Sequence, residues 1–276
     1  MRPLHVPQLL RRFGLRPKKS LGQNFLVDEA ALARVAAAAD LSPSDTVLEI
    51  GPGLGSLTRH LAEAARRVVA VELDQDLLPA LRFVVEPYAN VDIVQGDILG
   101  LDPSALSLEP AYKVVANIPY YITSAVIRRL LEAAIRPALI VLTVQREVAE
   151  RMCAAPGAMS LLAVSVQFYS RPRVVARIPA GAFHPRPEVD SAVVRLEVLP
   201  EPAAAVEDVD GFFQVVRAGF SQKRKQLHNA LAAGLRLESS VLEPALAQAG
   251  VDPKRRAETL TLAEWGAVAR ELAPAR

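Results

Sequence analysis

A strand followed by a glycine-rich turn constrains the fold of this chain more than any other stretch. Residues 47–55 read Val-Leu-Glu-Ile-Gly-Pro-Gly-Leu-Gly, and the apolar residues predict a buried strand. The glycines at alternate positions are Gly51, Gly53 and Gly55. Glycine lets the backbone approach a ligand closely, and Ser56 can cap a helix that begins at Leu57. The pattern predicts a nucleotide-binding unit, with a tight turn that binds nothing as the alternative.

Two acidic residues follow the neighbouring predicted strands. Glu72 ends the apolar run 68–71, twenty-one residues after Gly51, where an acid can accept hydrogen bonds from both ribose hydroxyls of an adenosine ligand. Asp97 follows the run 91–94 and is placed to accept from the adenine amine. The Gly-x-Gly-x-Gly spacing differs from that of dinucleotide enzymes and resembles the S-adenosylmethionine pocket of class I methyltransferases. This resemblance implies S-adenosylmethionine as the cofactor.

The spacing of apolar runs predicts an α/β fold. Predicted strands cover 46–50, 67–72, 91–95, 113–117 and 137–144, and predicted helices cover 29–39, 56–65, 75–85, 123–133 and 145–154. This alternation is typical of a parallel sheet with helices on both faces. Two more strands are predicted at 161–169 and 189–198. Their connection, 171–188, is too short for a crossover helix, so we expect an antiparallel pair at one edge of a Rossmann-like sheet.

A length of 276 residues leaves room for a large domain and a smaller one. We expect a catalytic domain over residues 1–199, a linker rich in Ala and Pro, and a small helical domain over residues 207–276. Four apolar residues of the second domain share one helical face: Phe212, Phe213, Val216 and Phe220. Thr261 and Glu264 form a capping-box pattern at the last predicted helix.

The amino-terminal segment joins positive charge to a polar motif. Residues 1–20 are predicted to be irregular, because three prolines oppose a long helix. The motif Gly-Gln-Asn-Phe-Leu follows at 22–26. Its chemistry suits a lid in which Asn24 hydrogen-bonds a ligand while Phe25 and Leu26 cover it, and a plain capping turn is the alternative.

Positive charge gathers in two segments that lack acids, although the formal net charge is only +2. The segments are residues 1–27, with six Lys and Arg, and residues 211–237, with five. Such segments favour a polyanionic partner, and two solvated faces are the alternative. The residues expected to contact RNA are Arg11, Arg12, Lys18, Lys19, Lys223, Arg224 and Lys225.

Composition argues against several other classes of protein. The single cysteine, Cys153, excludes an internal disulfide, and the four histidines lack metal-ligand spacing, so we expect no metal. The longest uncharged run, 152–170, is broken by polar residues, proline and glycine, which argues against a membrane span. We expect a cytoplasmic protein, because the amino terminus lacks an apolar signal core and has too little serine for a transit peptide.

The most specific motif, Asn-Ile-Pro-Tyr at 117–120, ends the fourth predicted strand. Ligands of open parallel sheets bind at the carboxyl ends of the strands, so Asn117 is expected beside Gly51, Glu72 and Asp97. The motif differs by one residue from the Asn-Pro-Pro-Tyr box of enzymes that methylate exocyclic amines of adenine. A strand-to-loop turn with a buried tyrosine is the alternative.

The residue types of this motif suit methyl transfer to an amine. An adenine N6 amine is a poor nucleophile because its lone pair is delocalised into the ring. The side-chain oxygen of Asn117 and the carbonyl of Ile118 can accept its hydrogens and favour a pyramidal nitrogen. Pro119 stiffens the turn, and Tyr120 can stack on the extruded base, a contact worth about 1–3 kcal/mol. No strong base is needed, since the protein's task is positioning.

Five motifs together identify a family. They are Lys-Ser-Leu-Gly-Gln-Asn-Phe-Leu (19–26), Glu-Ile-Gly-Pro-Gly-Leu-Gly (49–55), Gly-Asp-Ile-Leu (96–99), Asn-Ile-Pro-Tyr-Tyr (117–121) and Phe-His-Pro-Arg-Pro-Glu-Val-Asp-Ser-Ala-Val (183–193). In this order they resemble the ribosomal RNA adenine N6,N6-dimethyltransferases over nearly the whole chain, and most closely the small-subunit branch. The family commonly has Leu where this chain has Ile118, but only the backbone carbonyl is required there.

The resemblance implies a substrate and residue roles. The expected substrate is a pair of adjacent adenosines in the 3′-terminal hairpin of 16S rRNA, dimethylated in an immature small subunit by a monomeric enzyme. Asn117 to Tyr120 match the target-amine site, and Phe183 matches a position that packs against the flipped adenine, with a core Phe as the alternative. The cofactor-binding positions that the resemblance implies are Asn24, Leu26, Gly51, Glu72, Asp97 and Asn117. We expect the other two glycines of the turn, Gly53 and Gly55, to bind the cofactor as well.

Other functions fit part of the same pattern. One is adenine methylation of large-subunit rRNA or of DNA. Another, of a different class, is a ribosome-assembly factor that acts mainly by binding immature subunits.

Overall fold

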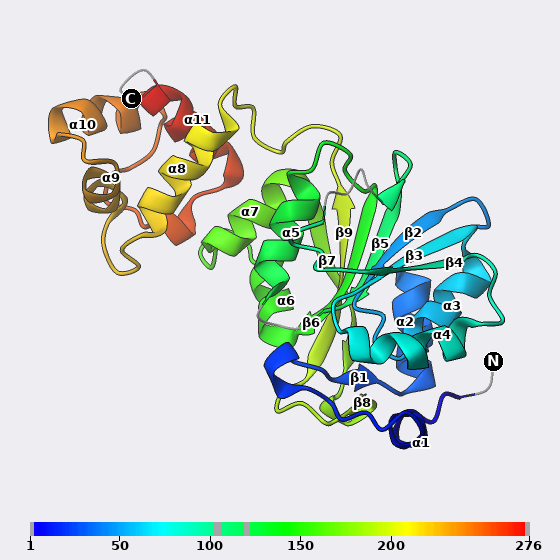
Figure 1. Ribbon diagram of the computed structural model, residues 1–276. Coiled ribbons are helices and arrows are strands. Elements are labelled where there is room, and N and C mark those ends of the chain that lie inside the picture. Colours follow the sequence, from blue (N-terminus) through cyan, green and yellow to red (C-terminus); the bar gives the residue numbers. More distant parts are fainter. Residues whose placement is uncertain (1–2, 102–105, 119–121, 274–276) are drawn as a thin grey trace. The chain divides into compact units, whose positions relative to one another are not determined.

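The computed structural model describes residues 3–101, 106–118 and 122–273. Its main sheet has seven strands in the order β4-β3-β2-β5-β6-β9-β7 (Figure 1). The bounds are β2 Thr46–Ile50, β3 Arg67–Glu72, β4 Val91–Gln95, β5 Lys113–Asn117, β6 Leu139–Gln145, β7 Ser170–Ile178 and β9 Ser191–Val198. The first five strands in this order, β4-β3-β2-β5-β6, pair in parallel with their neighbours. Strand β9 pairs antiparallel with β6. The predicted α/β class, with an antiparallel strand near one edge, is confirmed.

The order of the strands fixes where the helices and the ligand site lie. The chain runs from β2 to β3 and β4 in one direction, then returns to β5 and continues to β6 in the other. Right-handed crossovers therefore place the helices of the two halves on opposite faces of the sheet. The helices are α2 Glu29–Ala38, α3 Ser56–Ala64, α4 Leu78–Val85, α5 Thr123–Leu131 and α6 Arg146–Met152. The reversal point, between β2 and β5, is where such sheets bind ligands.

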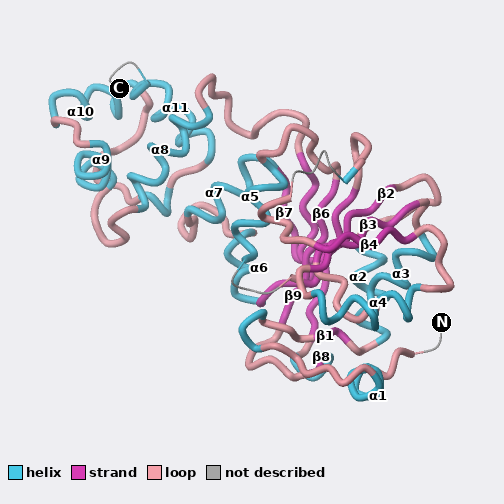
Figure 2. Tube along the Cα trace, in the orientation of Figure 1, coloured by secondary structure: helices cyan, strands magenta, loops and turns pink. Residues whose placement is uncertain are grey.

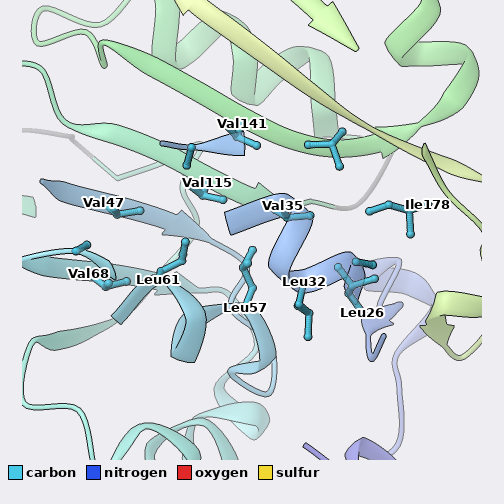
Figure 3. Close-up of a cluster of buried hydrophobic side chains, with 14 of the residues drawn as sticks. Leu26, Leu32, Val35, Val47, Leu57, Leu61, Val68, Val115, Val141 and Ile178 are labelled. Carbon is cyan, nitrogen blue, oxygen red and sulfur yellow. The ribbon is translucent and has the colours of Figure 1, made fainter. Parts of the chain in front are cut away.

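Branched side chains from four strands form the core beneath α2 and α3 (Figure 3). The strand residues are Val47, Val68, Val115 and Val141, and they pack with Leu57 and Leu61 of α3 and Leu32 and Val35 of α2. Each such buried side chain contributes about 1.5–3 kcal/mol. Strand β2 is buried at all five positions, as expected for a central strand covered on both faces, although it includes the polar residues Thr46 and Glu49.

The amino-terminal segment contains a short helix where irregular structure was predicted. Helix α1, Val6–Arg12, accepts Pro7 in its first turn, where no backbone hydrogen bond is lost. Its buried residues Leu9 and Leu10 belong to the same apolar cluster as Leu81 of α4. Packing of this apolar face, rather than helix propensity, explains the helix. Farther on, β1 (Phe25–Leu26) pairs antiparallel with β8 (Phe183–His184) in a separate two-stranded sheet.

The predicted strand at 161–169 is wrong, because these residues form helix α7, Leu161–Tyr169. Ser160 caps the helix by accepting a hydrogen bond from the Ala163 amide at 3.2 Å. The strand was predicted because Val164, Val166 and Phe168 alternate with Ser165 and Gln167. A pattern this short does not settle the choice between helix and strand, and the cap decides it. The strand instead begins directly after this helix, at Ser170, as β7. Its exposed arginines and Pro172 are tolerated because β7 lies at an edge of the sheet.

The chain divides into two compact units, which Figure 2 shows as a strand-rich and a helical part. One comprises Met1–Ala149 and Pro172–Val198, and the other comprises Glu150–Arg171 and Leu199–Arg276. The second unit contains α7 together with α8 Val209–Phe220, α9 Leu227–Leu235, α10 Ser239–Gln248 and α11 Leu262–Leu272. The sequence did not predict that α7 groups with the carboxy-terminal helices. Stacking of Phe168 of α7 on Phe212 of α8, with ring centroids 4.6 Å apart, accounts for this grouping.

Close packing and capping define the helical unit. Trp265 is fully buried, and a Cβ at Gly219 would lie 2.4 Å from its ring, so only glycine fits there. The capping box of Thr261 and Glu264 is present, as predicted. None of the helices within the described ranges combines the length and apolar character needed to cross a bilayer.

Candidate active site

The glycine turn adopts a backbone that favours glycine. Gly51, Gly53 and Gly55 have φ angles of +68°, +59° and +82°. A Cβ at Gly53 would lie 3.0 Å from the Phe25 ring, and one at Gly51 would lie 3.8 Å from the Asn117 carbonyl oxygen. The turn therefore lies between the polar motif at 22–26 and the end of β5.

The end of this turn corrects one sequence prediction and adds a packing contact. Helix α3 begins at Ser56 itself and is preceded by the left-handed Gly55, so the serine makes no side-chain cap. Gly55 is not among the described residues that line the cavity discussed below. A Cβ there would meet Val84 and Leu81 of α4 at 3.0 and 3.1 Å. The structure thus gives this glycine a packing role, and its predicted cofactor contact stays a prediction.

Glu72, at the end of β3, is a buried and firmly held carboxylate. One oxygen accepts a hydrogen bond from the Gly53 amide at 2.9 Å, and the other accepts from the Asp74 amide at 2.8 Å. Burial raises the pKa of Glu72, while these backbone hydrogen bonds oppose the shift. Each carboxylate oxygen has a further lone pair, so the group can still accept from two hydroxyls of a ligand.

The lid segment, defined as residues 18–26, runs along the cavity. Its residues 21–26 all line the cavity, and Phe25 and Leu26 are buried. Pairing of β1 with β8 joins the segment to the loop that carries Phe183. The segment also leads into Asp28, whose carboxylate caps α2 by accepting from the Ala31 amide. The capping turn, one of the two alternatives posed by the sequence, is therefore present, and a lid that covers a bound ligand stays a prediction.

Asn117 ends β5, which lies between β2 and β6. Its side-chain nitrogen donates a hydrogen bond to the Asn24 backbone oxygen at 3.2 Å. Ile118 is buried beside it and lines the same cavity. Pro119 and Tyr120, the rest of the predicted target-amine site, lie outside the described residues.

One cavity collects most of the predicted cofactor and target groups. Its lining includes Asn24, Leu26, Gly51, Gly53, Glu72, Asp97, Asn117, Ile118 and Phe183. Asp97 is exposed, and its Oδ1 accepts from the Leu99 amide at 2.9 Å. Phe183 is 5 % exposed and packs in the core with Leu26, so the core role posed as its alternative is present even though its ring also reaches the cavity.

Glu49 is a cavity residue that the sequence reasoning missed. It lies on β2, is 1 % exposed, and its Oε2 has no hydrogen-bond partner within the described ranges. Burial, opposed by the Thr58 hydroxyl and assisted by the charge of Glu72, raises the pKa of Glu49 to about 8. An acid inside an otherwise apolar strand, just before the glycine turn, was the available signal.

The predicted RNA contacts are divided between the two units. Lys223, Arg224 and Lys225 are exposed in the connection between α8 and α9 of the helical unit. Arg11, Arg12 and Lys19 are exposed in the other unit, where the Arg12 guanidinium lies 4.0 Å from the centre of the Phe83 ring. Lys18 instead forms ion pairs with Asp74 and Asp76.

The residues of the cavity fit S-adenosylmethionine. Glu72 offers acceptors for two vicinal hydroxyls, and Asp97 offers an acceptor for an exocyclic amine. The carboxylates of Glu72 and Asp97 suit a ligand that carries positive charge, and the unpartnered Glu49 oxygen is available for a hydrogen bond to it. The described residues contain no group of three or more His, Cys, Asp or Glu side chains suited to a metal ion.

Comparison with known proteins decides the family. A family model described as ribosomal RNA adenine dimethylase matches residues 14–273. The chain belongs to this family. It is therefore an rRNA adenine dimethyltransferase whose methyl donor is S-adenosylmethionine. The family recognised from five sequence motifs is confirmed.

Similar proteins come from several bacteria. The chain is 47 % identical over 269 residues to a protein of Dehalococcoides mccartyi (strain CBDB1) named ribosomal RNA small subunit methyltransferase A, covering 96 % of this chain and 92 % of that protein. Proteins of the same name from Pelotomaculum thermopropionicum and Moorella thermoacetica are also 47 % identical, over 280 and 275 residues. These alignments cover 97 % and 96 % of this chain, and 95 % of each relative.

Two solved structures share the fold of this dimethylase. The 23S rRNA methyltransferase ErmE superposes with a TM-score of 0.72 at 31 % identity, over 90 % of this chain and 99 % of its own. A dimethyladenosine transferase from Plasmodium falciparum gives 0.71 at 25 % identity, over 90 % and 96 %.

Proposed function

We propose that this dimethylase acts on small-subunit rRNA and converts two adjacent adenosines of the 3′-terminal hairpin of 16S rRNA to N6,N6-dimethyladenosine. The observation that carries the proposal is the meeting of Glu72, Asn24 and Asn117 at one cavity. The relatives at 47 % identity, named small-subunit methyltransferases, favour the small-subunit target over the large-subunit target of ErmE, which is 31 % identical.

In this proposal the cofactor is held by acceptors at the ends of two strands, β3 and β4, and by the lid segment. Glu72 binds the ribose hydroxyls and Asp97 the adenine amine, while Asn24 and Leu26 close over the ligand. The glycine turn lets the backbone approach the cofactor closely. A Cβ at Gly53 would lie 3.0 Å from the Phe25 ring of the lid segment, so glycine suits this position. S-adenosylmethionine supplies a methyl group that is already strongly electrophilic.

The end of β5 prepares the target amine. Asn117 Oδ1 and the Ile118 carbonyl accept hydrogen bonds from the two amine hydrogens, which draws the nitrogen lone pair out of conjugation with the ring. Tyr120 stacks on the extruded base, and Phe183 supports it from the loop that pairs with the lid segment. The amine proton leaves to water, so the chain needs no strong base.

Exposed basic residues bind the RNA through its phosphates. In this proposal Lys223, Arg224 and Lys225 contact rRNA from the helical unit, and Arg11, Arg12 and Lys19 contact it from the catalytic unit. The enzyme acts as a monomer in the cytoplasm on an immature small subunit.

Mapping of the modified nucleotides tests the proposal. Purified protein and isotope-labelled S-adenosylmethionine are incubated separately with unmethylated small-subunit particles, with large-subunit rRNA and with DNA, and products are identified by mass spectrometry. We expect two adjacent dimethyladenosines in the 3′-terminal hairpin of 16S rRNA. Label on 23S rRNA or DNA alone would reject the small-subunit target.

A second test separates catalysis from assembly. Cells that lack the endogenous enzyme are complemented with wild type or with Asn117→Ala, and 16S maturation is followed. If the inactive variant restores maturation fully, the main role is binding rather than methylation.

A further inference from the structure

Lys18 and Gln23, both in the lid segment, converge on one buried carboxylate. Lys18 Nζ lies 2.6 Å from Asp74 Oδ1, and Gln23 Nε2 donates to Asp74 Oδ2 at 2.7 Å. The Lys18 amide donates to Gln23 Oε1 at 2.8 Å, which closes the arrangement. The Asp74 side chain is only 3 % exposed, whereas that of Lys18 is 40 % exposed. Asp74 thus receives two donors from a segment more than fifty residues away.

Asp74 also belongs to the cofactor site through its backbone. Its amide donates to Glu72 at 2.8 Å, and the other oxygen of Glu72 accepts from Gly53. Gln23 directly precedes Asn24, whose carbonyl accepts from Asn117. Hydrogen bonds and short stretches of covalent backbone, through Asp74 and through the Gln23–Asn24 peptide, therefore connect Lys18 with the proposed ribose acceptor and with the target-amine motif.

The charges favour an ion pair that persists over a wide pH range. Burial alone would raise the pKa of Asp74, but the hydrogen bonds from Lys18, Gln23 and the Asp76 amide outweigh it and lower the pKa. The pKa of Lys18 is raised, first by its hydrogen bond to Asp74 and then by that to Asp76. The Lys18 ammonium therefore already faces two carboxylates, which makes it a weaker candidate for a phosphate contact than its exposed neighbour Lys19.

We propose that Lys18, Gln23 and Asp74 form a latch that holds the lid segment over the cofactor, so that Lys18 is a positioning residue for the cofactor and not an RNA contact. The latch rests on the cofactor site proposed above. It acts before RNA binds, because each of its hydrogen bonds lies within the chain. Losing the latch leaves Glu72 in place but lets the lid segment open.

Calorimetry with S-adenosylhomocysteine and the full-length chain tests the latch. Lys18→Met keeps the length of the side chain and removes its charge, Asp74→Asn weakens the same ion pair, and Lys254→Met, at an exposed lysine of the helical unit, is the control. We expect Kd to rise by about threefold to tenfold in the first two variants, the range for a partly exposed charged hydrogen bond, and to stay unchanged in the control. The double variant should be weakened no more than the worse single variant, because both substitutions remove the same interaction.

Hydrogen exchange without any cofactor gives a second readout. Amides of residues 19–24 should exchange faster in Lys18→Met than in wild type, while those of β2 and β3 keep their protection. Unchanged Kd and exchange in Lys18→Met would overturn the latch. A reduced salt dependence of RNA binding in that variant, with unchanged Kd, would return Lys18 to the RNA contacts. Failure of the wild type itself to bind S-adenosylhomocysteine would instead reject the proposed cofactor site.

Discussion

The side chain of Asn117 donates a hydrogen bond to the backbone oxygen of Asn24 across 3.2 Å. The two residues are 93 positions apart in the chain and belong to the two motifs that border the cavity. Since the donor end of the amide is used on the lid segment, Oδ1 is the atom that can accept from a target amine. The bond therefore couples the position of the lid to the orientation of the group proposed to polarise that amine.

Asn117→Ala should slow methyl transfer while leaving RNA binding intact. The interaction with the amine strengthens as its nitrogen becomes pyramidal, and loss of one preorganised polar interaction of this kind costs on the order of 10²–10³ in turnover. Single-turnover rates at saturating RNA and cofactor measure this effect. A modest loss of cofactor affinity is expected as well, because the Asn24 hydrogen bond is removed. Rates near those of wild type would contradict the role given to Asn117.

Tyr120 should act through its ring and not through its hydroxyl. Tyr120→Phe keeps the stacking surface and should retain most of the activity, whereas Tyr120→Ala removes a contact worth about 1–3 kcal/mol and should lower the occupancy of the flipped base. A fluorescent adenine analogue at the target position reports that occupancy. If Tyr120→Phe is as inactive as Tyr120→Ala, the hydroxyl of Tyr120, and not its ring face, is the group required for activity.

Glu72→Ala should weaken cofactor binding without unfolding the chain. Loss of hydrogen bonds to a charged acceptor costs roughly 1.5–3 kcal/mol, which corresponds to about 10- to 150-fold in Kd. Glu72→Gln is the matched control, because its amide oxygen still accepts one hydrogen bond, and it should lie between Ala and wild type. Calorimetry that finds wild-type affinity in a folded Glu72→Ala variant rejects the ribose assignment.

Glu49 should make the chain less stable as the pH rises. Burial raises its pKa from 4.5 to about 8 in the folded state. Between these values the unfolded chain releases the proton while the folded chain keeps it, so the free energy of unfolding falls with pH and levels off above about 8. In Glu49→Gln the free energy of unfolding should fall less over this pH range, by an amount on the order of a few kcal/mol. Some of the fall should remain, because the pKa of Glu72 is also raised in the folded state.

Urea denaturation of Glu49→Gln and wild type at pH 5.5 and 8.5 measures the difference. The variant should gain on wild type at the higher pH. Parallel pH profiles of the two proteins would show that Glu49 is ionised in the folded state throughout this range.

Local motifs account for the parts of the site that the sequence predicted. The glycine turn, Glu72 and Asn117 follow apolar runs directly, and the topology of a parallel sheet brings strand ends together. The polar motif at 22–26 was placed near the ligand by its composition alone. For these residues, neighbours in sequence and one rule of topology were sufficient.

What sequence reasoning missed depends on partners that are distant in the chain. The ion pair of Lys18 with Asp74 spans 56 positions, and the packing role of Gly55 depends on α4. Glu49 gains its raised pKa only when the sheet buries it. The run 161–169 was misassigned because Ser160, outside the run, decides between helix and strand.

The basic residues between α8 and α9 should govern the salt dependence of RNA binding. Lys223, Arg224 and Lys225 are exposed, so replacing all three by Ala should not disturb the helices. For every phosphate that the variant no longer neutralises, the slope of log Kd against log salt should fall by about one, because fewer counterions are released. The reciprocal variant, in which Lys and Arg are exchanged at all three positions, keeps the charge and should keep the slope. Cofactor affinity should stay unchanged in both variants, since these residues do not line the described cavity. A slope equal to that of wild type in the Ala variant would identify the three residues as a solvated face, the alternative posed by the sequence.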